Sequence, residues 1–181
     1  MSASLTVTKL DAAKRQLDAA IQLFFSDADP VVIHSLATSA ANVLFDVAEN
    51  GSNGTSWRTR MRDDNGLSTK DVKYILHKAW NFFKHAEHDP NGVLQFDPID
   101  SEHMMFAAIL ECGDQDQTSC YMQAFQLWYI AAHPEFFPPT ESVFVDAAQL
   151  FPNLASVSHA VQVQRGHAFL TEHCKLHGAE T

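Results

Sequence analysis

Cysteine is scarce in this sequence, and long hydrophobic runs are missing. The chain has only three cysteines, Cys112, Cys120 and Cys174, an odd number that does not suit a disulfide framework, so we expect three reduced thiols. No apolar run approaches the roughly 18 residues that a membrane span needs. The N-terminal stretch has no apolar segment of the kind found in secretory signals. These absences predict a cytoplasmic protein that does not associate with membranes.

Basic residues are missing from the second half of the chain. Residues 85–164 contain no Lys or Arg but eleven Asp or Glu, so this stretch repels phosphate groups and is not expected to contact nucleic acid. Seven Lys or Arg gather in segment 58–84. If the protein binds RNA or another anionic ligand, we expect the contact there, with Arg58, Arg60 and Arg62 at its start. The alternative is that both regions are solvated protein surface.

The common motifs of nucleotide-binding and hydrolytic enzymes are also absent. The sequence has no P-loop, no Rossmann glycine pattern, no Gly-x-Ser-x-Gly and no zinc-finger spacing. A ferritin-like bundle needs a Glu-x-x-His motif on each of two helices, and neither Glu135 nor Glu172 has such a histidine. The sequence therefore predicts no cofactor.

Apolar residues recur at helical spacing, and alternating strand patterns are absent. Segments 8–27 and 30–49 are expected to form an antiparallel helical hairpin, with Asp29 as cap and Pro30 at the first helical position. The polar segment 50–68 is expected to be a loop. Further helices are expected over 68–88, 100–112, 118–132, 141–150 and 156–177. The fold class is all-α, a helical bundle with a four-helix core and additional C-terminal helices, in a single domain over residues 1–181.

The third expected helix carries two different faces when it is drawn at 100° per residue. One face is apolar and consists of Val72, Ile75, Leu76, Ala79, Phe83 and Ala86. The opposite face is a polar row, with Lys84 at its edge, and consists of Tyr74, His77, Asn81, His85 and His88. His85 is therefore expected to point away from the core of its own bundle.

Three interpretations of His85 stay open on the residues alone. Cationic groups such as Lys84 and His85 in the last turn of a helix are favoured by the helix dipole, which needs no function. Alternatively, His77 and His85 could contribute to a zinc or nickel site, but further ligands would have to come from elsewhere, such as His34 or His103. The third interpretation is acid–base chemistry, because a histidine titrates near neutrality.

The paired N-terminal helices followed by "WNFFKH" resemble the HEPN superfamily of small helical-bundle proteins. Ribonucleases of this superfamily carry an arginine, usually a polar residue next, and a histidine four to six residues beyond the arginine. Asn81 matches the polar position and His85 the histidine, while Trp80 stands where the arginine is expected. The resemblance implies a homodimer with a site at the dimer interface, where the arginine and histidine of active members act on the RNA phosphodiester.

The replacement of the arginine by Trp80 favours binding over catalysis, because charge that develops on phosphate would lose its best bidentate partner. The preferred interpretation is a non-catalytic binding or dimerisation module that uses the face around Tyr74, His77, Asn81, Lys84 and His85. One alternative is a metal-independent ribonuclease with His85 as acid–base group and Asn81 or Lys84 on the phosphate. The other alternative is a His-rich protein that binds divalent metal.

Overall fold

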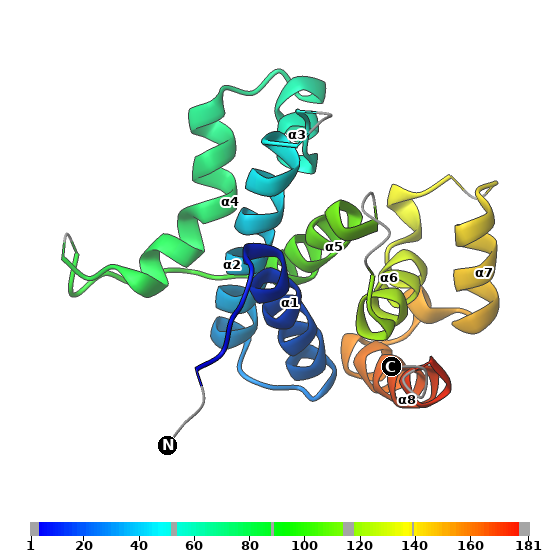
Figure 1. Ribbon diagram of the computed structural model, residues 1–181. Coiled ribbons are helices and arrows are strands. Elements are labelled where there is room, and N and C mark those ends of the chain that lie inside the picture. Colours follow the sequence, from blue (N-terminus) through cyan, green and yellow to red (C-terminus); the bar gives the residue numbers. More distant parts are fainter. Residues whose placement is uncertain (1–3, 52–53, 88, 114–117, 139, 178–181) are drawn as a thin grey trace.

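The computed structural model describes residues 4–51, 54–87, 89–113, 118–138 and 140–177. Within these ranges all regular structure is helical and no strand occurs, so the all-α prediction is confirmed (Figure 1). The elements are α1 (Lys9–Phe25), α2 (Pro30–Glu49), α3 (Trp57–Asp64), α4 (Thr69–Lys84), α5 (Ile99–Gly113), α6 (Cys120–Ala132), α7 (Ser142–Leu150) and α8 (His159–His177), with the 3-10 turns η1 (Pro134–Phe136) and η2 (Leu154–Ser156).

The hairpin of α1 and α2 occupies the centre of the molecule (Figure 1). Thr8 and Asp11 close a capping box at the start of α1, and Asp29 accepts hydrogen bonds from the first amides of α2. Pro30 at the first helical position of α2 lacks the N–H that would otherwise need a partner. The predicted hairpin and its Asp-Pro signal are confirmed.

Helix α2 is the core helix, and it packs against α1, α4 and α5. In the described part of the chain it is the one helix that is long and apolar enough, by length and composition, to cross a membrane. The expectation that the chain has no apolar segment long enough to span a membrane therefore does not hold for α2. Ala37, Ala40 and Leu44 are completely buried, so one face of α2 packs in the core of the fold.

Two helix boundaries in the middle of the chain differ from the expectation. Segment 50–68 was expected to be a loop, yet α3 forms within it because Ser56 and Thr59 close a capping box. Helix α4 begins after its N-cap, Ser68, as the expected range 68–88 implies, but it ends at Lys84, because His85 already has an extended backbone (φ −126°, ψ 121°). His88, expected near the end of this helix, lies outside the described residues.

Helices α6, α7 and α8 form a second layer beside the hairpin (Figure 1). Helix α6 falls within the segment 118–132 that was expected to be helical, and its Phe125 and Trp128 are completely inaccessible to solvent. Cys120 and Cys174 form a disulfide that joins the start of α6 to α8, so the expectation of three reduced thiols is wrong for this pair. Cys112 is free and buried, and burial raises the pKa of its thiol to about 11.

Candidate functional site

A pocket of about 570 Å³ lies where α2, α3, α4 and α5 meet the end of α6 and η1. Its walls are mostly aromatic and aliphatic, with a few polar side chains among them. The aromatic walls are Trp57, Phe96, Phe106, Tyr129, Phe136 and Phe137. The aliphatic walls are Met61, Ile75, Leu76, Ala79, Leu94, Met104 and Ala107. The polar side chains are His34, Lys78, Gln95, Asp100 and His103.

Helix α5 supplies one continuous wall of this pocket. Its first turn is capped by Asp97, which accepts a hydrogen bond from the amide of Ile99 at 3.1 Å. Asp100, His103, Met104 and Ala107 follow at the spacing i, i+3, i+4 and i+7, which places them on the same face of the helix. The sequence "FDPIDSEHMMFA" therefore presents two polar and two apolar side chains to the same space.

His34 on α2 is a buried polar residue in the pocket wall. Its Nε2 lies 3.2 Å from the Thr38 hydroxyl and its Nδ1 lies 3.3 Å from the Ser101 hydroxyl, and the Phe96 ring packs against its edge. Burial lowers the pKa of His34 to about 4, so the ring is neutral at pH 7. His34 is therefore a buried, hydrogen-bonded histidine.

His103 and Tyr129 form the second polar pair of the pocket. Nδ1 of His103 lies 2.7 Å from the Tyr129 hydroxyl, and the Tyr129 ring stacks on Phe106 with a centroid distance of 4.2 Å. Burial, with a smaller contribution from His133, lowers the pKa of His103. Burial also raises the pKa of Tyr129 above its usual range, so both groups are neutral at pH 7.

A buried carboxylate lies behind His103. Glu102 is only 2% exposed and accepts hydrogen bonds from Nε2 of His133 at 3.2 Å and Nε2 of His159 at 2.8 Å. These contacts join α5 to the end of α6 and the start of α8. The two histidine partners of Glu102 come from segments that are distant in the sequence.

Two opposite charges belong to the pocket wall, Lys78 on α4 and Asp100 on α5. The pKa of Asp100 is raised, chiefly by partial burial and next by Asp97, while Lys78 acts in the opposite direction. Because one cation and one anion line the same pocket, the pocket has no strong net charge of its own.

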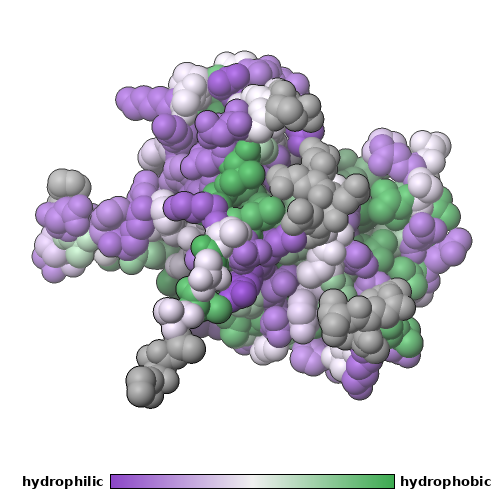
Figure 2. Space-filling model, in the orientation of Figure 1, coloured by the Kyte–Doolittle hydropathy of each residue, from purple (hydrophilic) through white to green (hydrophobic). Residues whose placement is uncertain are grey.

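The residues predicted from the HEPN resemblance lie at the exposed end of α4, outside this pocket. Nδ1 of His85 is 3.5 Å from a carboxylate oxygen of Glu87, and both side chains are about half exposed or more. Asn81 is exposed, and the Lys84 ammonium lies over the Trp80 ring, 3.1 Å from its centroid. Hydrophilic residues cover much of this projecting part of the surface (Figure 2).

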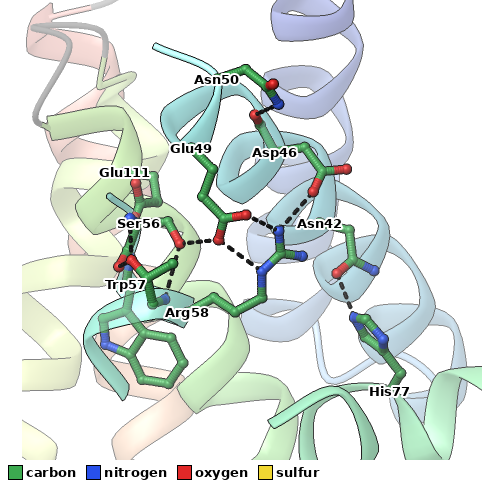
Figure 3. A network of polar contacts seen from close by, with 10 residues as sticks. Asn42, Asp46, Glu49, Asn50, Ser56, Trp57, Arg58, His77 and Glu111 are labelled. Atoms are coloured by element: carbon green, nitrogen blue, oxygen red, sulfur yellow. Dashed lines mark hydrogen bonds and ion pairs between the residues drawn. The ribbon is translucent and has the colours of Figure 1, made fainter. Parts of the chain in front are cut away.

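His77 does not belong to the outward row, and this part of the expectation is wrong. Its Nε2 donates a hydrogen bond of 2.6 Å to Oδ1 of Asn42 on α2 (Figure 3), and burial lowers its pKa. Tyr74, on the same helix, is exposed as expected. The buried side of α4 is therefore rotated toward Val72, Leu76 and His77, and Ile75 is left at the pocket wall.

The three arginines expected to contact anionic ligands all have carboxylate partners, and Figure 3 shows those of Arg58. Arg58 binds Glu49 through two nitrogens, at 3.0 and 2.6 Å, and Asp46 at 2.7 Å. Arg62 pairs with its neighbour Asp63. Arg60 lies 3.6 Å from Glu111, whose carboxylate also accepts a hydrogen bond from the amide of Trp57. The basic charge at the start of segment 58–84 is thus largely neutralised within the protein.

The described residues contain no group of three or more His, Cys, Asp or Glu side chains arranged to hold a metal ion. His34 and His103, named as further ligands for a site with His77 and His85, instead line the pocket.

Comparison with known proteins identifies no relative. No protein-family model matches the sequence, and neither a curated protein nor a solved structure matches it. The HEPN resemblance therefore stays a prediction, and the local geometry is the basis for a functional hypothesis.

Proposed function

We propose that this protein is a non-catalytic binding module that holds a small, mostly apolar molecule in the pocket between α4, α5 and η1. The observation that carries the proposal is the pocket itself. Its volume of about 570 Å³ falls in the range of roughly 300–1,000 Å³ that is typical of small-molecule sites. Aromatic walls with a few convergent polar groups are also typical of such sites.

The state of the polar groups supports binding over chemistry. Both ring nitrogens of His34 are occupied by hydroxyl groups, which leaves neither nitrogen for proton transfer to a ligand. His85, the acid–base candidate from the sequence, is far from being enclosed, with a side chain that is 48% exposed. A solvent-exposed histidine without an arginine beside it gives little stabilisation to charge developing on phosphate.

We further propose that the bundle is HEPN-like, that the protein is a homodimer and that it is located in the cytoplasm. Exposed apolar side chains on α4 support the homodimer, since Tyr74 is 63%, Ile75 52% and Phe82 38% exposed. Light scattering coupled to size exclusion tests this part. A dimer that becomes a monomer on Tyr74→Glu agrees with it, and a monomeric wild type contradicts it.

Filling the pocket tests the proposed function. Ala79 lines the pocket on α4, so Ala79→Trp is expected to occupy the space that a ligand needs. Ala148→Trp is the matched control, because Ala148 is an exposed helical alanine on α7 that does not belong to the pocket. Ligand-observed NMR with a library of uncharged aromatic fragments, among them naphthalene, measures binding to each variant.

The two variants are expected to behave differently. Wild type and Ala148→Trp should bind the same fragments, and Ala79→Trp should lose them while it keeps the wild-type circular dichroism spectrum. Equal binding by all three proteins would place the fragments elsewhere and overturn the proposal. The absence of binding to the wild type would overturn it as well.

A further inference from the structure

The His103–Tyr129 pair determines which protons the pocket presents to a ligand. Tyr129 is 4% exposed, and among the described residues its hydroxyl has one hydrogen-bonding partner, Nδ1 of His103 at 2.7 Å. A buried hydroxyl proton needs an acceptor, and a neutral imidazole nitrogen is a much better base than a phenol oxygen. Tyr129 therefore donates its proton to Nδ1 of His103.

This hydrogen bond assigns the tautomer of His103. A neutral imidazole carries one proton, and when Nδ1 accepts, the proton must be on Nε2. His103 is neutral at pH 7, because burial lowers its pKa. In the part of the chain that the structure describes, Nε2 of His103 has no hydrogen bond or ion pair, and no buried side-chain nitrogen or oxygen lacks a hydrogen-bond partner. Nε2 is thus accessible, and the ring to which it belongs lines the pocket.

The charges of the pocket limit what can pair with this donor. Lys78 on α4 and Asp100 on α5 carry opposite charges and line the same pocket, so a ligand with a net charge would gain attraction from one and repulsion from the other. His34 offers no free ring nitrogen, since both are bonded to hydroxyl groups. The remaining walls are largely aromatic and aliphatic, and these favour flat, apolar rings.

We propose that the pocket selects uncharged aromatic molecules with a hydrogen-bond acceptor, such as a ring nitrogen or a carbonyl, and that Nε2–H of His103 donates to that acceptor. This inference rests on the proposed function and adds the ligand class to it. Tyr129 is a positioning residue here, because it acts on the ligand only through the tautomer and orientation of His103.

Quinoline and naphthalene make a suitable pair of probes. Both are two fused rings of nearly the same size, and quinoline differs by one ring nitrogen that accepts a hydrogen bond and is uncharged at pH 7.5. 1H–15N NMR titrations measure the dissociation constants of both probes for wild type and for His103→Leu. For each protein, the quantity compared is the ratio of the quinoline Kd to the naphthalene Kd. Comparing the ratios cancels the different solvation of the two probes in water.

The ratio of the quinoline Kd to the naphthalene Kd is expected to rise when the donor, Nε2–H of His103, is removed. A neutral hydrogen bond corresponds to about a 3- to 10-fold change in affinity, so His103→Leu should weaken quinoline by about that factor relative to naphthalene. Tyr129→Phe should shift the ratio in the same direction by less, because His103 remains but loses its fixed tautomer. A ratio unchanged in His103→Leu would overturn the inference.

The tautomer can also be measured directly in the wild-type protein, which needs no variant. The imidazole nitrogen shifts in a long-range 1H–15N spectrum should show the proton of His103 on Nε2 and an acceptor at Nδ1. A proton found on Nδ1 would overturn the inference even if His103→Leu fails to fold. If Ala79→Trp abolishes naphthalene binding while the ratio does not depend on His103, acceptor recognition is wrong and the pocket proposal survives. If Ala79→Trp leaves both probes bound, the pocket proposal itself falls.

Discussion

Replacing Arg58 by alanine distinguishes a structural arginine from one that waits for an anionic ligand. The Arg58 side chain is 15% exposed, and Glu49, its bidentate partner, is 25% exposed. Asp46, the third contact, is 65% exposed and contributes little because solvent screens it. Arg62 on the same helix forms an ion pair with its exposed neighbour Asp63, and Arg62→Ala is the matched control.

The expected cost follows from the two contacts to Glu49. Hydrogen bonds to charged groups contribute about 1.5–3 kcal/mol each when buried, and partial exposure reduces this. We therefore expect Arg58→Ala to lower the free energy of unfolding by about 2 kcal/mol, which corresponds to a decrease in Tm of about 4–8 °C for a protein of this size. Arg62→Ala should leave stability unchanged within experimental error, because its ion pair lies at the surface.

The difference in free energy of unfolding between wild type and Arg58→Ala is expected to depend on pH, with a defined sign. The hydrogen bond from Arg58 lowers the pKa of Glu49 from its ordinary value of 4.5, so Glu49 contributes stability above pH 4.5 that is lost as the pH falls through its folded pKa. The difference between wild type and Arg58→Ala, measured by urea unfolding, should be largest near pH 7 and shrink below pH 4.5. Equal stability of the two proteins at pH 7 would refute the structural role, as would a difference that grows in acid.

Two further predictions concern the packing of α8. A Cβ on Gly166 would overlap the buried Phe25 ring and lie 2.8 Å from Cδ1 of Trp128. Gly166→Ala should therefore destabilise the protein by about 1–3 kcal/mol through overpacking, measured by thermal unfolding. Gly113→Ala is the control: no atom lies near the added Cβ, so this variant should be neutral or stabilising in the same assay. The disulfide between Cys120 and Cys174 joins residues that are 54 positions apart in the sequence. Cys120→Ser should therefore have a free energy of unfolding about 3–4 kcal/mol below that of the oxidised wild type. The mutant and wild type should be equally stable once the wild type is reduced, and a loss that persists in reductant would contradict the disulfide as its cause.

Local signals in the sequence predicted the helices that begin at strong caps. Asp29 before Pro30 and Ser68 before Asp71 mark the starts of α2 and α4, because these side chains bond the first free amides of each helix. Helix α3 was missed since its sequence, "WRTRMRDD", has no apolar stripe. Its stability depends on distant partners, such as the contact of Arg58 with Glu49 on α2.

The candidate site was harder to predict than the helices. The helical wheel assigns Ile75 and Ala79 to the core, but these residues border a pocket instead, and Ile75 is 52% exposed. The packed side of α4 includes His77 because Asn42 on α2 supplies a hydrogen-bonding partner. A one-dimensional pattern identifies an apolar face but not whether a neighbouring helix fills the space beside it.

The pocket itself is assembled from segments far apart in the chain. His103 on α5 meets Tyr129 on α6 only after folding. Phe136 and Phe137 come from η1 and the residue that follows it, after the end of α6. From the sequence His34 and His103 were considered only as possible further ligands of a metal site, whereas both line the pocket. Their convergence on one cavity depends on tertiary packing, which no local spacing encodes.

Chemical-shift mapping with quinoline tests the central claim most directly. In a 1H–15N titration of the wild-type protein, the shifts should concentrate on the α5 face that carries Asp100, His103 and Ala107, and on Ala79 across the pocket. Shifts confined to the end of α4 around Asn81 and His85 would contradict the pocket as the binding site, and so would an unchanged spectrum at saturating probe.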